Sequence, residues 1–210
     1  MTTLCLTNDT LSPADFQTLV DAVKYYTPLI TKAWKLPDVI VTTTPIKGAW
    51  VVNITDKNRH LGASGYHTVA NGIPTAWCSP QASGRLWGHY IAPLILKKVQ
   101  IHGALYTPGL VTTVLHEIAE MLVDPVIQTL SAKDSQGRQW LVEVCDHVFG
   151  TYQVHSIGQN VCVFPNITTP AFYDLKGKAP YDLLGVVTAP FSLTPKGYAY
   201  YKGPSGLVKI

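Results

Sequence analysis

The sequence predicts an α+β fold, in which two amphipathic helices are separated by a series of short strands. Three observations predict it. A helical pattern begins after residue 11, runs rich in β-branched residues follow it, and a second helical pattern begins near residue 107. Hydrophobic residues make up 47% of the 210 residues, which supplies enough apolar material for a packed core and excludes a disordered chain.

The first predicted helix has a clear beginning. Ser12 can cap it, Pro13 suits its first position, and Asp15 completes a capping box. Apolar residues then recur at helical spacing. Pro28 is expected to break or kink this helix, with residues 29–34 continuing as a second helical piece.

Strand signals follow the first helix. The predicted strands cover residues 39–44, 49–55, 61–67 and 74–79. Residues 56–59 and the pair Asn71-Gly72 are expected to form turns between them. The segment 84–99 is ambiguous, because Pro93 divides a pattern that otherwise resembles a helix.

The second predicted helix starts at Thr107, with Pro108 at its first position, and ends at Asp124-Pro125. Its apolar face is formed by Val111, Val114, Leu115, Ile118, Ala119 and Leu122. A polar turn at 131–137 and short strand or mixed segments follow, at 140–148, 151–155 and 160–164. Residues 1–165 are therefore expected to form one domain. Residues 166–210, rich in Pro, Gly and Tyr, are expected to form an irregular extension packed on this domain or on a neighbouring subunit.

Composition excludes several classes of protein. Charged residues make up 14% of the chain, against about 25% in an average soluble domain. The 16 Lys and Arg residues form no basic stripe, so nucleic acid is not an expected partner. No apolar run has the roughly 18 residues that a membrane span needs, and no signal peptide is visible. The four cysteines are widely spaced, which indicates reduced, buried thiols, and the low charge is typical of a surface covered by other subunits.

The second helix carries the motif His116-Glu117-Ile118-Ala119-Glu120. Residues four apart lie on one helix face, so His116 and Glu120 can bind one ion. Glu117 lies beside them, where a carboxylate can accept a proton from metal-bound water, as in H-E-x-x-H metallopeptidases. The carboxylate of Glu120 in place of a second histidine would also admit Mn²⁺, Ca²⁺ or another hard cation. The alternative is a solvated helix face with no ion.

A downstream segment can supply further ligands. Glu143, Asp146 and His147 lie within five positions of one another, and a catalytic zinc site requires a third protein ligand. His147 adjoins Asp146 and could orient its carboxylate. His67, at the end of a predicted strand, could contact a substrate.

Together, His116-Glu117-x-x-Glu120-x-x-x-Asp124-Pro125 and Glu143-Val144-Cys145-Asp146 resemble a zincin-type metallopeptidase-like domain of tailed-phage virion proteins and uncharacterised bacterial proteins. The resemblance covers roughly residues 35–200. It implies a zincin-like fold with a mixed, twisted sheet packed on two main helices, an edge strand lining a cleft, and a metal at the second helix.

Carried over to this chain, the resemblance makes His116 and Glu120 zinc ligands and Glu117 the general base. The third ligand is Glu143, at the spacing of the distant glutamate of gluzincins, or Asp146. Asp124 is expected to serve the turn beside Pro125 instead.

The function expected from this resemblance is a structural component of a phage virion that binds zinc or another divalent cation and could retain residual peptide-bond hydrolysis. Its partners would be other virion proteins or copies of itself, and it would be assembled in the host cytoplasm. The alternatives are an active zinc metallopeptidase that uses Glu117 on a peptide substrate, and a metal-binding protein of the bacterial cytoplasm. Neither nucleic acid nor membrane is an expected partner.

Overall fold

The computed structural model describes residues 1–57, 63–86 and 108–210, and within them the chain is α+β. The helices are α1 (Pro13–Trp34), α2 (Pro80–Leu86) and α3 (Leu110–Val123), with a 3₁₀-helix η1 (Pro170–Tyr173). The strands are β1 (Thr2–Asn8), β2 (Val39–Thr42), β3 (Trp50–Ile54), β4 (Gly65–Ala70), β5 (Ile73–Cys78), β6 (Leu130–Lys133), β7 (Gln139–Leu141), β8 (Tyr152–Ile157), β9 (Asn160–Pro165), β10 (Tyr200–Gly203) and β11 (Gly206–Lys209).

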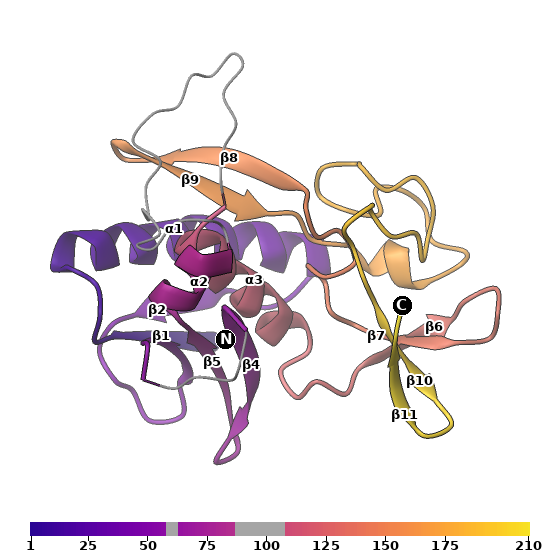
Figure 1. Cartoon of the computed structure of the whole chain (residues 1–210), viewed down its shortest axis with the longest axis horizontal. Helices are drawn as coiled ribbons and strands as arrows, with labels where there is room; N and C mark the ends of the chain where they lie inside the picture. Colours follow the sequence, from indigo (N-terminus) through magenta and orange to yellow (C-terminus); the bar gives the residue numbers. More distant parts are fainter. Residues whose placement is uncertain (58–62, 87–107) are drawn as a thin grey trace.

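The N-terminal half forms a mixed five-stranded sheet in the order β2-β1-β3-β5-β4. Its neighbouring strands are parallel except for β4, which lies at the edge and runs antiparallel to β5. Helices α1 and α3 lie between this sheet and the β8–β9 hairpin (Figure 1). A second sheet, β11-β10-β7-β6, lies beside these layers and brings the end of the chain next to β7.

Strand β1 is a central strand that the sequence analysis did not predict. Its middle residues Leu4, Cys5 and Leu6 are buried between β2 and β3. The predicted strands β2 to β5 are present within two residues of most expected bounds, and the turn at Asn71-Gly72 joins β4 to β5. Both turn residues have positive φ values, 52° and 77°, as a two-residue hairpin turn requires. Part of the predicted turn at 56–59, the start of the strand at 61–67 and most of the segment 84–99 lie outside the described residues.

Helix α1 begins as predicted, because the side chain of Ser12 accepts a hydrogen bond from the backbone N–H of Asp15 at 3.2 Å. The expected break at Pro28 is wrong, since one helix continues to Trp34. Packing offsets the loss of one backbone donor: Ile30, after the proline, is fully buried in the core.

Helix α3 begins later than expected. Its N-cap is Gly109, whose backbone N–H donates to Oγ1 of Thr112 at 3.2 Å. Pro108 therefore precedes the helix instead of opening it, and Thr107 lies outside the described residues. The predicted end is correct: Asp124 is the C-cap, and its backbone N–H donates to the carbonyl of Glu120 at 2.7 Å.

Residues 166–210 share the core of the residues before them. Ile167, Phe172, Tyr173, Val187 and Ala199 are buried in the same hydrophobic cluster as α1 and α3. This segment is less irregular than expected, because it ends in the antiparallel hairpin β10–β11.

Two side chains of α1 have their hydrogen-bond acceptors in the last third of the chain. The hydroxyl of Tyr26 donates to the carbonyl of Pro165 at 2.7 Å, and Nε1 of Trp34 donates to the carbonyl of Thr168 at 2.8 Å. The first helix and the last third of the chain are therefore joined by hydrogen bonds across more than a hundred residues.

The four cysteines, Cys5, Cys78, Cys145 and Cys162, are free and buried, as predicted. No helix among the described residues combines the length and apolar character needed to cross a membrane.

Candidate metal centre

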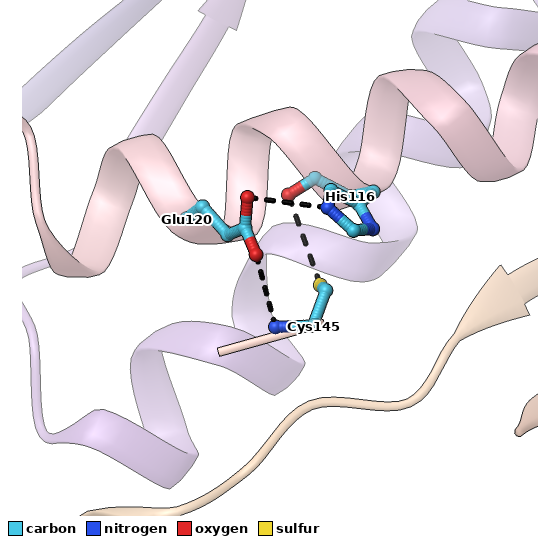
Figure 2. Close-up of side chains that lie close together, drawn as sticks. All are labelled: His116, Glu120 and Cys145. Atoms are coloured by element: carbon cyan, nitrogen blue, oxygen red, sulfur yellow. Dashed lines mark hydrogen bonds and ion pairs between the residues drawn. The ribbon is translucent and has the colours of Figure 1, made fainter. Parts of the chain in front are cut away.

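Helix α3 carries the predicted motif on a buried face. Glu117 and Glu120 are only 7% and 3% exposed, so the alternative of a solvated helix face is wrong. Nε2 of His116 lies 3.2 Å from Oε2 of Glu120, one helical turn later. Figure 2 shows these two side chains meeting on one side of α3, with Cys145 facing them.

The segment after β7 brings two further donor groups to His116. Oδ1 of Asp146 lies 3.2 Å from Nε2 of His116, although the two atoms are outside hydrogen-bond geometry. The backbone N–H of Cys145 donates to Oε1 of Glu120 at 3.2 Å, and its Sγ lies 3.8 Å from the carbonyl oxygen of His116. Glu120 is therefore held by the chain on one oxygen and faces His116 with the other.

Strand β4 supplies a second histidine on the other side of the motif. Nδ1 of His67 lies 3.4 Å from Oε2 of Glu117 and 3.9 Å from Oε2 of Glu120. Burial alone would lower the pKa of His67, but the hydrogen bond with Glu117 and the charge of Glu120 raise it above its ordinary value. Nε2 of His67 is buried and has no hydrogen-bond partner among the residues that the structure describes.

Glu143 lies close to the carboxylates of Glu120 and Asp146, and its Oε2 has no hydrogen-bond partner among the described residues. Its Oε2 is buried and makes no hydrogen bond, and its residue is 7% exposed. Burial first, and then the charges of Glu120 and Asp146, raise the pKa of Glu143 to about 11. Ordinary carboxylates are not buried in this way unless a cation or a proton compensates the charge.

Four carboxylates thus gather around two histidines, and they are Glu117, Glu120, Glu143 and Asp146. No described Lys or Arg side chain forms an ion pair with any of them. Burial opposes the charged form of His116, yet the charges of Glu120 and of its other neighbours raise the pKa of its imidazole well above the usual value. Buried acidic side chains therefore outnumber the basic ones at the described site, four carboxyl groups against two imidazoles.

Two hollows meet at this cluster, with volumes of about 430 and 290 Å³. Gly65, His116, Glu117 and Tyr198 line both of them. The larger hollow also reaches Cys145, whereas the smaller one is lined by His67, Glu120, Glu143 and Asp146. The polar centre can consequently be reached by a small ligand instead of being sealed in the core.

Gly65 allows β4 to approach α3 closely. A Cβ atom at this position would lie 2.7 Å from Cγ2 of Thr113 and 2.8 Å from both Cγ and Oε1 of Glu117. A side chain would have to displace these groups, so the glycine fixes the distance between the edge strand and Glu117.

Two other polar residues of the motifs have structural partners. The carboxylate of Asp124 accepts hydrogen bonds from the backbone N–H of Gln128 and from the backbone and hydroxyl of Thr129, which is the turn role predicted for it. His147 is fully buried, where its ring lies 5.6 Å from that of Trp140 and Nδ1 is 3.1 Å from the hydroxyl of Tyr173. Burial lowers the pKa of His147 to about 4, so it packs as a neutral core residue.

The donor atoms form two compact groups. His116, Glu120 and Cys145 form one group, and His67, Glu117 and Glu120 form the other, with the donor atoms of each group within 4.8 Å of one another. Imidazole, carboxylate and thiolate are all ligands of Zn²⁺ and of related divalent cations. The residues present therefore fit a divalent cation, by donor chemistry and by their uncompensated charge.

Sequence reasoning underestimated two of these residues. Cys145 was expected only as a buried thiol, although its position beside Asp146 in the downstream motif placed it near any ligand there. His67 was considered only as a possible substrate contact, and its contact with Glu117 was not predicted. Their partners lie 29 and 50 residues away, which no local pattern indicates.

Comparisons of the chain with protein-family models, with curated proteins and with solved structures found no match.

Proposed function

We propose that this chain is a zincin-like metalloprotein whose centre binds zinc, or another divalent cation, through His116, Glu120 and Asp146. The observation that carries the proposal is the position of Nε2 of His116, 3.2 Å from a carboxylate oxygen of each of the other two residues. Three protein ligands that leave one position open are typical of catalytic zinc sites.

Asp146 is preferred to Glu143 as the third ligand because its oxygen approaches His116 directly. At this separation, the oxygen of Asp146 and Nε2 of His116 are close enough to contact one cation between them. Cys145 is close enough to be a further donor. Burial keeps the pKa of its thiol well above the usual value, which favours the neutral thiol when no cation is near.

The arrangement supports hydrolysis of a peptide bond. A bound divalent cation would supply Lewis acidity at the hollow that His116 lines. Glu117 would accept a proton from water on its carboxylate, and His67 would hold that carboxylate through Oε2. The edge strand β4, which pairs with β5 on one side, offers backbone groups on its other side to an extended peptide.

A measurement of metal content tests the metal site. We expect at least one zinc per chain in gently purified protein and loss of the zinc held by His116 in His116→Ala, because that imidazole lies close to both carboxylate ligands. His155→Ala is the matched control, since His155 packs against Phe164 in the β8–β9 hairpin, away from the centre. Absence of metal from the folded wild-type protein would refute the proposal.

Activity is tested separately from binding. Glu117→Gln should retain the cation but lose peptide hydrolysis by roughly 10²–10⁴-fold, the usual contribution of a general base. Equal turnover in the wild type and in Glu117→Gln would remove the catalytic role and leave a metal-binding one.

We further propose that this domain is a component of a phage particle, assembled with other virion proteins or with copies of itself. Exposed apolar side chains support an assembly role, because six of the thirteen large ones among the described residues lie in the last 45 residues. Those side chains are Leu175, Leu184, Val186, Leu207, Val208 and Ile210. The low charge of the chain is also typical of a surface covered by other subunits.

Particle composition tests the virion role. The protein should be present stoichiometrically in purified particles, and Leu207→Asp should reduce its incorporation while the isolated protein keeps its circular dichroism spectrum. Detection only in the bacterial cytoplasm, as an unassembled chain, would favour the metal-binding alternative.

A further inference from the structure

The two donor groups of the centre meet at one residue. Glu120 belongs to the group with His116 and also to the group with His67 and Glu117. Its Oε2 lies 3.2 Å from Nε2 of His116 and 3.9 Å from Nδ1 of His67. A carboxylate between two imidazoles can bridge two cations, one on each side.

The side of the centre away from Cys145 has its own unused donors. Oε2 of Glu143 is buried without a hydrogen-bond partner among the described residues, and Glu143 and His67 both line the smaller hollow. Each residue is more than nine-tenths buried. An unpaired carboxylate oxygen at this depth is costly, so Oε2 of Glu143 beside this hollow indicates a ligand there.

The charge of the cluster agrees with two cations. Glu117, Glu120, Glu143 and Asp146 carry a formal charge of −4 when ionised, and no described Lys or Arg is paired with them. One divalent cation would leave two negative charges buried, whereas two would neutralise the site.

We propose that the centre holds two divalent cations that share the carboxylate of Glu120. The first is the cation proposed above, on His116, Glu120 and Asp146, and the second is bound by His67, Glu117 and Glu120, with Glu143 as a further oxygen donor. The inference depends on the proposed first site, because the two sites share a ligand. The oxygen-rich donor set of the second site suits Mn²⁺ as well as Zn²⁺.

This assignment divides the role of Glu117 between two states of the protein. With the second cation bound, Oε2 of Glu117 is a ligand on the side of His67. The base role proposed above then belongs to the protein loaded with one cation.

Manganese binding to the full chain tests the proposal. Metal would be removed by chelation, Mn²⁺ added back by equilibrium dialysis, and the bound ions counted by plasma mass spectrometry. We expect about two Mn²⁺ per wild-type chain, with an electron paramagnetic resonance spectrum that shows exchange coupling between two close ions. His67→Ala should bind about one and lose the coupled signal, whereas His155→Ala should bind two.

A second variant guards against misfolding of His67→Ala. Glu143→Gln has nearly the same volume and should weaken the second site at least tenfold while its circular dichroism spectrum stays unchanged.

The outcomes distinguish the two proposals. One ion in the wild type, lost in His116→Ala and retained in His67→Ala, would overturn the second site and leave the first intact. No bound ion in the folded wild type would overturn both. Two coupled ions in both the wild type and His67→Ala would overturn the assignment of His67 as a ligand.

Discussion

Replacement of Gly65 by alanine tests whether close contact between β4 and α3 requires a glycine. The added Cβ would lie 2.7 Å from Cγ2 of Thr113 and 2.8 Å from Cγ of Glu117. Carbon atoms pack best at about 3.5–4.0 Å, so the new atom would lie roughly 0.8 Å inside the first contact. Both neighbours are themselves buried on α3, and neither can leave without disturbing the centre.

The expected cost is that of overpacking a buried site, about 1–3 kcal/mol of unfolding free energy. Urea unfolding of the metal-free protein, followed by circular dichroism, would measure it. Metal must be removed because a cation bound only to the folded state would add its own stabilisation. The wild type and the variant should have the same dependence on urea concentration if only stability changes.

A second substitution separates the steric explanation from others. Thr113→Ser removes the Cγ2 atom but keeps the hydroxyl that accepts a hydrogen bond from Ser83 at 3.2 Å. In combination with Gly65→Ala it should restore part of the lost stability, so that the two changes cost less together than the sum of their separate costs. A loss below about 0.5 kcal/mol in Gly65→Ala, or strictly additive costs, would refute the steric reasoning.

Three further predictions concern the carboxylates. In the metal-free protein the pKa of Glu143 is raised to about 11, so the folded chain keeps a proton that the unfolded chain releases above about pH 4.5. Stability should therefore fall as the pH rises through this window, and Glu143→Gln should flatten the dependence in thermal unfolding at a series of pH values. Asp182 is fully buried and accepts hydrogen bonds from Asn166 and three backbone N–H groups, so Asp182→Ala should cost about 3 kcal/mol in urea unfolding. The exposed Asp174, whose carboxylate accepts one bond in a turn, is its control and should change stability by under about 1 kcal/mol. Finally, Asp146→Asn should weaken zinc binding at least tenfold. The Co²⁺-substituted wild type should lack a strong thiolate-to-metal absorption band. If such a band is present and is lost in Cys145→Ser, Cys145 is the third ligand instead of Asp146.

Local sequence signals predicted the elements whose patterns are self-contained. The cap at Ser12, the turn at Asn71-Gly72 and the end of α3 at Asp124 depend on neighbouring residues only, and all three are present. Tertiary packing decided the others. Helix α1 continues through Pro28 because Ile30 beyond it is buried.

Three strand regions that were not predicted have a similar origin: β1, β10–β11, and β6, which occupies Leu130–Lys133 where a turn at 131–137 was expected. Strand β1 is recognisable only from the two parallel strands on either side of it. Strands β10 and β11 have only four residues each, so their sequences carry little local pattern.

Local sequence patterns likewise predicted only part of the metal centre. His116, Glu117 and Glu120 share a helix, so their spacing alone predicts that they lie close together. Glu143 and Asp146 follow β7 outside any regular helix or strand, and no periodicity indicates which of them reaches His116. The contact between His67 and Glu117 requires the register of β4 against α3, which is set by the whole sheet.

The hydrogen bonds from α1 to the last third of the chain have a consequence for the order of folding during synthesis. Tyr26 and Trp34 find their acceptors at Pro165 and Thr168, which leave the ribosome long after α1. At about 5–20 residues per second, roughly 7–28 s pass between the synthesis of these side chains of α1 and the synthesis of their acceptors. Contacts between residues this far apart in sequence are slow to form. The growing chain therefore cannot complete its first layer early, and the donor atoms of the centre come into register only after most of the protein has been made.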